Sequence, residues 1–457
     1  MEVSSKSESV VYVQKNRWTR SVHIAVHALC ALVIIALVLV ILVISVPGAK
    51  ESSSGSSSSD SGGGVNEGEG GGQGLSPSTP KPSMRDGRLD FIAIGDWGVE
   101  QTGSEDSENK TMTAEALRVE LEQMATTPQS FDAKFIIGTG DNFYPNGLVP
   151  GDDTLFYEAF AEPYAFTPLP WFNVLGNHDY ESIAIAEEWG ERLRGLDARW
   201  TCHREYSILK TVSALDGAEP FTVHFFFIDT TPLIEKYHKR INKCLDTALP
   251  ADQDGCDAGN NGLKVIEPAM EIKLRSAASG GAIPEEEKMQ VWKTFREQQA
   301  LKLRELLQHS DARWKIVVGH HGIYSQGDDG DFDDLKRTFL SMLKENGVHV
   351  YLNGHDHTLQ HIKFDAHPTH FITTGSGAKV DEGMPRSFKE RPPQRCMPDS
   401  FPEICDSPTM DFFTNANGFT KMSISRDEIY VAHVAVIDTK TGESGEIVHE
   451  HTIPYEA

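Results

Sequence analysis

The chain has 457 residues, of which 42 are basic and 67 acidic, and its formal net charge at pH 7 is −25. This length allows one large domain or two ordinary domains with a sizeable core. The excess of acidic residues disfavours a nucleic-acid partner, because a surface that binds a polyanion needs Lys and Arg side chains to displace its counterions.

An apolar segment near the amino end predicts a transmembrane helix. The chain has no charged residue between Arg20 and Lys50, and residues 28–46 are apolar except for Ser45. A run of about 20 apolar residues is long enough to cross a bilayer as a helix. A cleaved signal peptide and a buried core helix are the alternatives, but the apolar region of a signal peptide is shorter, about 7–15 residues. We therefore predict an uncleaved signal anchor over residues 21–46.

The flanks of this segment predict its orientation and a stalk. Lys15, Arg17 and Arg20 precede it, and only Lys50 follows it closely. The positive-inside rule then places residues 1–20 in the cytosol as a tail and the rest of a single-pass membrane protein in an extracellular or lumenal space. Residues 47–87 are rich in Ser, Gly and Pro and lack apolar periodicity, which predicts a flexible stalk.

The cysteines and one glycosylation sequence fit this topology. Cys30 lies in the predicted membrane segment, and the other five are Cys202, Cys244, Cys256, Cys396 and Cys405. Their compartment permits disulfides, but sequence spacing does not determine the pairing. An odd number leaves one thiol free, and Cys202 is the candidate because the other four form two pairs that are close in sequence. Asn109-Lys110-Thr111 predicts a glycoprotein if this part of the chain is lumenal.

Short apolar runs in the rest of the chain predict buried strands. They cover residues 89–94, 134–137, 171–175, 223–228, 314–318, 348–352 and 370–374. Helical patterns lie over residues 113–124 and after Pro284, and residues 419–453 predict strands with a turn over residues 438–442. Residues 233–283 form a long irregular insertion. Strands interleaved with helices, followed by strands alone, predict an α/β fold with mixed sheets, arranged as a β-sandwich flanked by helices.

Residue types that bind metal ions follow directly after these strands. The candidates are Asp96, Asp141, Tyr144, Asn177, His320, His355 and His357. Loops at the carboxyl ends of strands converge at one end of such sheets. Gly140-Asp141-Asn142 alone is also ordinary turn sequence, but the recurrence of the pattern favours a metal site. Carboxylate and phenolate oxygens suit a hard cation, and a tyrosinate in particular indicates Fe(III).

The number of candidate ligands favours two metal ions. Asp141 is central enough in the set to bridge two cations about 3.5–4 Å apart. Such a pair activates water to hydroxide and holds the oxygens of a phosphoryl group that is displaced in line. The chemistry predicted is hydrolysis of a phosphate ester.

Five blocks stand in order along the chain: Gly95-Asp96-Trp97-Gly98, Gly140-Asp141-Asn142-Phe143-Tyr144, Gly176-Asn177-His178-Asp179, Gly319-His320-His321 and Gly354-His355-Asp356-His357. This set resembles the purple acid phosphatases, specifically the tartrate-resistant type, within the calcineurin-like metallophosphoesterase superfamily. The resemblance implies a four-layer sandwich, with residues 88–457 as the catalytic domain. Gly98 stands where wider metallophosphoesterases carry a histidine, and Tyr144 is present instead, which is the purple-phosphatase variation.

The resemblance also implies a role for each site residue. Fe(III) would be held by Asp96, Tyr144, His357 and the bridging Asp141, and a second divalent metal, Fe, Zn or Mn, by Asp141, Asn177, His320 and His355. Asp141 and His178 would be catalytic, and the substrate-binding residues would be Asn177, His178 and His321. His178 would contact the substrate phosphate and protonate the leaving group.

Two departures from the family and an alternative function remain. Animal members carry a second catalytic histidine in the loop after the Gly-His block, whereas residues 325–331 here offer only acids, and residues 233–283 are longer than in the small members. We expect a membrane-anchored phosphatase with phosphate monoesters as substrates, although the motifs do not separate these from diphosphates or phosphoproteins. The alternative is a phosphatase-fold membrane anchor or receptor for protein partners with little or no catalysis; loss of metal ligands would indicate it, and none is missing.

Overall fold

In the computed structural model the chain is divided into two units, residues 1–78 and residues 79–457, and only the second contains described residues. The described residues are 87–99, 104–123, 131–148, 153–181, 188, 191–213, 219–237, 284–364, 367–383, 408–436 and 445–455. The predicted tail, signal anchor and carboxyl-terminal turn lie outside them, as do all of the predicted stalk except Gly87, five of the cysteines and most of the predicted insertion. Among the described helices, none is both long and apolar enough to cross a membrane. Cys202 is a buried free thiol, as predicted.

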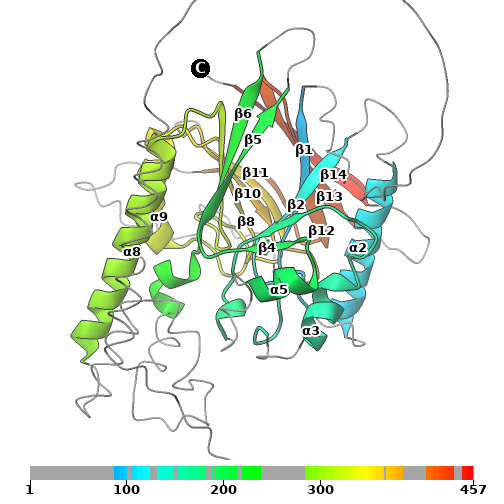
Figure 1. The fold of residues 1–457 in the computed structure, drawn as a ribbon, viewed down its shortest axis with the longest axis horizontal. Coiled ribbons are helices and arrows are strands. Elements are labelled where there is room, and N and C mark those ends of the chain that lie inside the picture. The colour runs from blue at the N-terminus through cyan, green and yellow to red at the C-terminus, as the bar shows by residue number, and fades with distance from the viewer. Residues whose placement is uncertain are drawn as a thin grey trace, which may run out of the picture. The chain divides into compact units, whose positions relative to one another are not determined.

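Two mixed sheets of seven strands form the centre of the second unit (Figure 1). The first has the order β14 (Glu446–Pro454), β13 (Glu428–Ala435), β12 (Gly418–Ile424), β1 (Leu89–Ile94), β2 (Ala133–Gly138), β3 (Trp171–Asn173) and β4 (Trp200–Cys202). The second has the order β11 (Thr409–Thr414), β9 (Leu359–Lys363), β10 (His370–Thr374), β8 (Val350–Asn353), β7 (Trp314–Val318), β6 (Phe221–Phe227) and β5 (Tyr206–Val212). Strands β1 to β4 pair in parallel, as do β6, β7, β8 and β10, while β12, β13 and β14 add antiparallel strands. This arrangement confirms the predicted α/β fold with mixed sheets.

The two sheets pack on each other through a shared apolar core. Along β1, Phe91 and Ala93 belong to this core, whereas Ile92 and Ile94 belong to a second core on the opposite face. Successive side chains of a strand point to opposite faces, so a strand covered on both sides is apolar throughout. The ring centroid of Phe91 lies 5.3 Å from that of Phe225 in the other sheet. The continuous apolar runs in the sequence therefore arise from burial on both faces.

Helices cover the outer faces of the sheets, with α2 (Glu105–Gln123) on one side and α8 (Glu285–Gln308) and α9 (Asp333–Glu345) on the other (Figure 1). The shorter helices are α3 (Thr154–Phe156), η2 (Tyr157–Ala161), η3 (Asp179–Glu181), α5 (Glu191–Leu196) and η4 (Thr231–Leu233). Helix α8 confirms the prediction of a helix after Pro284. Phe295, Gln299 and Leu303 lie on its buried face.

Helix α2 begins earlier than the predicted start at Thr113. Ser104 and Ser107 cap it reciprocally: the backbone N–H of Ser107 donates to Oγ of Ser104 at 3.2 Å, and the backbone N–H of Ser104 donates to Oγ of Ser107 at 3.1 Å. Acidic residues in the first turn add to this by facing the positive end of the helix dipole. The start was missed because apolar periodicity is weak in this first part. Asn109 of the predicted glycosylation sequence lies inside the helix.

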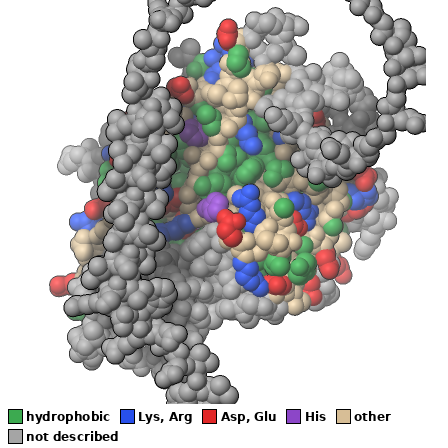
Figure 2. All heavy atoms as spheres, viewed as in Figure 1, with side chains coloured by type: hydrophobic (Ala, Val, Ile, Leu, Met, Phe, Trp, Pro, Cys, Tyr) green, Lys and Arg blue, Asp and Glu red, His purple; other side chains and the backbone are tan. Residues whose placement is uncertain are grey.

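One face of the molecule carries apolar side chains at its middle, with Lys, Arg, Asp and Glu side chains around them (Figure 2). Both signs of charge are mixed among the side chains of this face. The excess of acidic residues in the sequence is therefore not gathered into a single patch there.

Candidate metal centre

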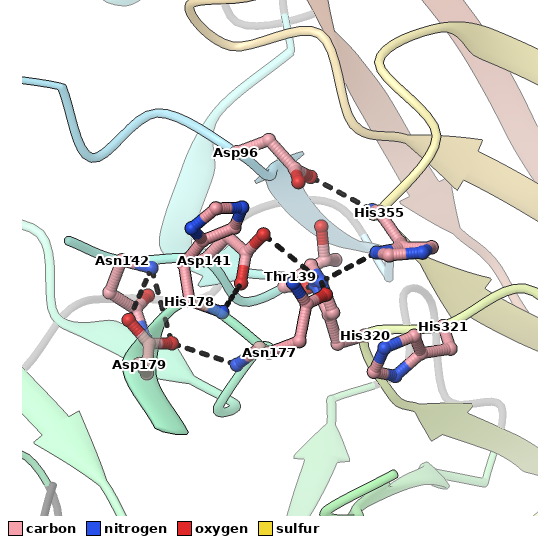
Figure 3. A network of polar contacts seen from close by, with 12 residues as sticks. Asp96, Thr139, Asp141, Asn142, Asn177, His178, Asp179, His320, His321 and His355 are labelled. Carbon is pink, nitrogen blue, oxygen red and sulfur yellow. Dashed lines mark hydrogen bonds and ion pairs between the residues drawn. The ribbon is translucent and has the colours of Figure 1, made fainter. Parts of the chain in front are cut away.

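All seven predicted metal ligands lie at one end of the two sheets, in loops that follow parallel strands. Figure 3 shows Asp96, Asp141, Asn177, His320 and His355 among them. Asp96 follows β1, Asp141 and Tyr144 follow β2, Asn177 follows β3, His320 follows β7, and His355 and His357 follow β8. Each strand presents its carboxyl end at the same edge, so ligands from both sheets meet. The structure thereby brings together residues as far apart in sequence as Asp96 and His355, whose backbone N–H donates to Oδ2 of Asp96 at 3.0 Å.

A first group of ligand atoms surrounds the phenol of Tyr144. Its Oη lies 3.1 Å from Oδ1 of Asp96 and 3.0 Å from Oδ2 of Asp141. Nε2 of His357 lies 3.3 Å from the same Oη and 3.6 Å from Oδ1 of Asp96. These are the four side chains predicted to hold Fe(III).

A second group surrounds Nε2 of His320. This atom lies 3.3 Å from Oδ1 of Asn177, 3.2 Å from Nδ1 of His355 and 3.4 Å from Oδ2 of Asp141. Oδ2 of Asp141 is therefore next to both groups of ligand atoms. A carboxylate oxygen in that position can bridge two cations.

Each candidate ligand histidine is oriented by a partner on its other ring nitrogen. Nδ1 of His320 donates to the carbonyl oxygen of Thr139 at 2.8 Å. Nδ1 of His357 lies 3.3 Å from Oδ1 of Asp381, and Nε2 of His355 lies 3.4 Å from Oδ2 of Asp329. A hydrogen bond of this kind fixes the tautomer and leaves the opposite nitrogen free to bind a metal.

Sequence reasoning missed these orienting partners. Asp329 lies in the stretch 325–331, where animal members carry a second catalytic histidine, and here it contacts the candidate ligand His355 instead. Tyr237 also contacts His355, with Oη at 3.3 Å from Nε2. Asp329 and Asp381 carried no signal of their own, because an isolated Asp in a polar loop is ordinary.

His178 lies beside the ligand groups without joining them. Its backbone N–H donates to Oδ1 of Asp141 at 2.8 Å, and its ring centroid lies 4.4 Å from that of Tyr144. Nδ1 faces the carbonyl oxygen of Pro145 at 2.6 Å, so this nitrogen carries the proton of the neutral ring and Nε2 is free. The side chain is half-buried, which leaves it open to a substrate at the centre.

His321 lies behind the ligand histidines rather than beside His178. Its side chain is fully buried, its Nδ1 lies 2.8 Å from Oγ1 of Thr230, and its ring centroid is 4.4 Å from that of His355. Burial lowers its pKa well below the ordinary range, and the neighbouring His355 and His320 lower it further. His321, which was predicted to bind the substrate, is thus a buried and neutral imidazole.

The electrostatics of the centre suit a cation. Burial raises the pKa of Asp96 to about 7, against the opposing effect of His320 and His357. Burial acts in the same way on Asp141, but His320 and other histidines outweigh it and hold the pKa of that carboxyl below its usual range. Burial and the carboxylates of Asp141 and Asp96 raise the pKa of Tyr144 well above the ordinary phenol value. Buried carboxylates and a phenol in contact are a donor set that bound metal ions would stabilise, so the residues fit a metal centre.

Backbone strain is also located at three of the candidate ligands. Asp96, Asp141 and His355 have positive φ angles of 57°, 50° and 73°, and they are the non-glycine residues with this conformation in the described part of the chain. Such conformations cost free energy and persist where the surrounding structure imposes them, often at functional sites.

A buried carboxylate holds two of the loops in place. Asp179 accepts hydrogen bonds from the backbone N–H groups of Asn142 at 2.9 Å, Phe143 at 3.1 Å and Gly176 at 2.7 Å. It therefore joins the loop that carries Asp141 to its own loop after β3. The fourth residue of the Gly-Asn-His-Asp block has this supporting position and is not a ligand.

Comparison with known proteins agrees with this geometry. Residues 89–359 match the calcineurin-like phosphoesterase family. Purple acid phosphatase 17 of Arabidopsis thaliana is 30% identical over 372 residues, which cover 81% of this chain and 86% of the plant protein. Tartrate-resistant acid phosphatase type 5 of Mus musculus is 24% identical over 360 residues, which cover 78% and 88% of the two chains. The solved structure of GAP50, described as the anchor in the inner membrane complex of Plasmodium, has a TM-score of 0.50 and 19% sequence identity. The match covers 81% of this chain and 90% of GAP50, and it shows the shared fold alone.

The fold and the family match define a calcineurin-like phosphoesterase. Within that class the chain belongs to the purple acid phosphatases, and it is a phosphatase. These relatives imply a binuclear metal centre, and the candidate ligand groups described above are present to form one.

Proposed function

We propose that this phosphatase is anchored in a membrane and hydrolyses phosphate monoesters at a centre of Fe(III) and a second divalent metal, Fe, Zn or Mn. The observation that carries the proposal is the position of Oδ2 of Asp141, which lies 3.0 Å from the phenol of Tyr144 and 3.4 Å from Nε2 of His320. Fe(III) is assigned to the side of Tyr144 and His357, because phenolate oxygen suits a hard trivalent ion. The second metal is assigned to the side of Asn177 and His320.

When bound, the two cations would polarise the phosphoryl oxygens of the ester and lower the pKa of a nucleophilic water. The side chains of the protein supply position and a proton. Asp141 holds the two ligand groups together, and its Oδ1 fixes the backbone of His178. With Nδ1 held by the carbonyl of Pro145, Nε2 of His178 is the ring nitrogen that can face the substrate, and from there it would donate a proton to the leaving oxygen.

Anchoring is inferred from the sequence of residues 21–46, which lie outside the described part of the chain. We place the amino end in the cytosol and the catalytic domain in an extracellular or lumenal space. In sealed vesicles, added protease should then digest residues 1–20 on the cytosolic side and leave the catalytic domain intact. Digestion of the catalytic domain in intact vesicles would contradict this orientation.

The activity is tested with two variants that separate metal binding from proton transfer. Asp141→Ala should abolish phosphatase activity and remove most bound metal, because it takes the shared ligand from both groups. His178→Ala should keep both metals and the visible absorption of an iron–tyrosinate bond, and lower turnover by about 10²–10⁴-fold. His309→Ala is the matched control, since this histidine is exposed at the carboxyl end of α8.

Normal hydrolysis by Asp141→Ala would overturn the metal assignment. A wild-type protein that is folded, colourless, metal-free and inactive would instead favour the alternative of an anchor or receptor for protein partners.

A further inference from the structure

A second cluster of metal-binding side chains lies apart from the candidate centre and shares no residue with it. His361, Asp411, His449 and His451 each offer one ligand atom, and these atoms all lie within 4.8 Å of one another. They come from β9, β11 and β14.

Three of the six separations between these ligand atoms fit a tetrahedral site. Nδ1 of His361 lies 3.2 Å from Nε2 of His449 and 3.6 Å from Oδ2 of Asp411, and Nδ1 of His451 lies 3.0 Å from the same Oδ2. Four ligands at the usual zinc–nitrogen and zinc–oxygen bond lengths stand about 3.3 Å apart in a tetrahedron. The three separations lie around that value, so a cation would require only small movements.

Local backbone structure aims the side chains at one point. His449 and His451 are two residues apart on β14 and therefore share a face of the strand. Asp411 is the extra residue of a β-bulge, because Met410 pairs with Ile362 and Phe412 with His361. A bulge re-aims the side chain of its extra residue, and here it turns a carboxylate toward the histidines.

The surroundings orient the ligand atoms as they do in metal sites. Nε2 of His361 lies 2.8 Å from Nδ1 of His370, so it is used in that hydrogen bond and Nδ1 is left to face the cluster. Lys363 donates to Oδ1 of Asp411 at 2.9 Å and leaves Oδ2 for a metal. Burial lowers the pKa of His361, His449 and His451, which favours the neutral imidazoles that bind metal, although Asp411 opposes the shift in the last two.

We propose that His361, Asp411, His449 and His451 bind a zinc ion that joins the two sheets at their edges. Strand β11 is the edge of one sheet and β14 the edge of the other, so the ion would tie together two strands that no backbone ladder connects. Zinc is the metal that suits the site, because three imidazole nitrogens and one carboxylate oxygen in a tetrahedron are typical of Zn²⁺. All four positions are filled by protein, which makes the site structural and not catalytic.

The test counts metal ions in the full-length chain. The protein is purified in detergent, equilibrated with zinc, freed of excess ion and measured by mass spectrometry. The double variant His449→Gln/His451→Gln should hold one zinc ion fewer per chain than the wild type, with its iron content and phosphatase activity unchanged. His309→Gln, at an exposed histidine outside the cluster, should match the wild type.

Equal zinc content in the double variant and the wild type would overturn the proposal. Asp411→Ala provides a second test in case the double variant fails to fold, because it removes the carboxylate ligand and leaves the three histidines in place. It should lose the same ion, and full retention of zinc by this variant would equally refute the site. Because the readout is the difference between variants, it is independent of how many metals the candidate centre holds.

Discussion

The acids behind two ligand histidines offer a test of which metal lies where. Asp381→Asn removes the charge behind His357, and Asp329→Asn removes the charge behind His355. Loss of such a partner typically weakens metal binding by about 10–100-fold, or about 1.4–2.7 kcal/mol. Because His357 is assigned to Fe(III) and His355 to the second metal, the two variants should lose different ions.

The structure also orders the two effects. The Asp381 side chain is 11% exposed, and its contact with His357 is shielded from solvent. Asp329 is 45% exposed and is shared with Lys236, whose Nζ lies 2.8 Å away, so water already screens its charge. We expect a change near 100-fold for Asp381→Asn and near 10-fold for Asp329→Asn.

The assay is a chelator titration read in two ways. Iron is followed by the visible iron–tyrosinate absorption and the second metal by mass spectrometry. Asp381→Asn should lose the colour at lower chelator concentration, whereas Asp329→Asn should lose the second metal first and keep the colour. Glu382→Gln, an exposed neighbour of Asp381, is the control. Loss of the same metal by both variants, or loss of colour in Asp329→Asn alone, would refute the assignment.

Three other predictions concern stability. Trp97 is fully buried, with its ring centroid 5.5 Å from that of Trp171. Trp97→Ala should therefore lower the free energy of unfolding, measured in urea, by about 3–5 kcal/mol. A loss below about 1 kcal/mol would contradict this packing. Burial lowers the pKa of Lys110 from 10.5 to about 7, despite Glu158, so above pH 7 the unfolded chain binds a proton that the folded chain lacks. Stability should therefore rise from pH 7 to 10 by up to about 1.4 kcal/mol per unit, and an unchanged slope in Lys110→Met would show that this lysine is not the cause. Removing metal with a chelator should lower the melting temperature, and an equal melting temperature with and without metal would argue against a buried centre.

The sequence predicted buried strands and candidate ligands correctly where the pattern for them lies within one continuous segment. The runs at residues 89–94 and 314–318 are apolar because both faces of their strands are covered, and each is followed by a ligand type. Strands β9 and β11 were not predicted, since His361 and Asp411 interrupt the apolar pattern in them. The two polar residues that interrupt the apolar pattern are members of the second cluster.

Contacts between distant segments could not be predicted from one sequence. Asp381 reaches His357 from a separate loop, and Tyr237 reaches His355 across 118 positions. The side chains of the second cluster lie on strands that are separated by long stretches of chain. Such pairs depend on how loops and sheets pack, which neither periodicity nor local motif reports.

The recurring sequence of glycine followed by a ligand has a physical cause in the packing of these loops. A Cβ atom at Gly140 would lie 2.6 Å from Nδ1 of His320, and one at Gly354 would lie 2.4 Å from Oδ2 of Asp96. Both neighbours are ligand side chains from another loop, and real Cβ atoms do not approach other atoms so closely. The loops must touch for ligands from both sheets to share one centre, and only glycine leaves room for that contact. The residues that follow, Asp141 and His355, then take the strained positive φ angles that point their side chains inward. The sequence pattern of glycine followed by a ligand residue thus reflects the close contact between loops of the two sheets.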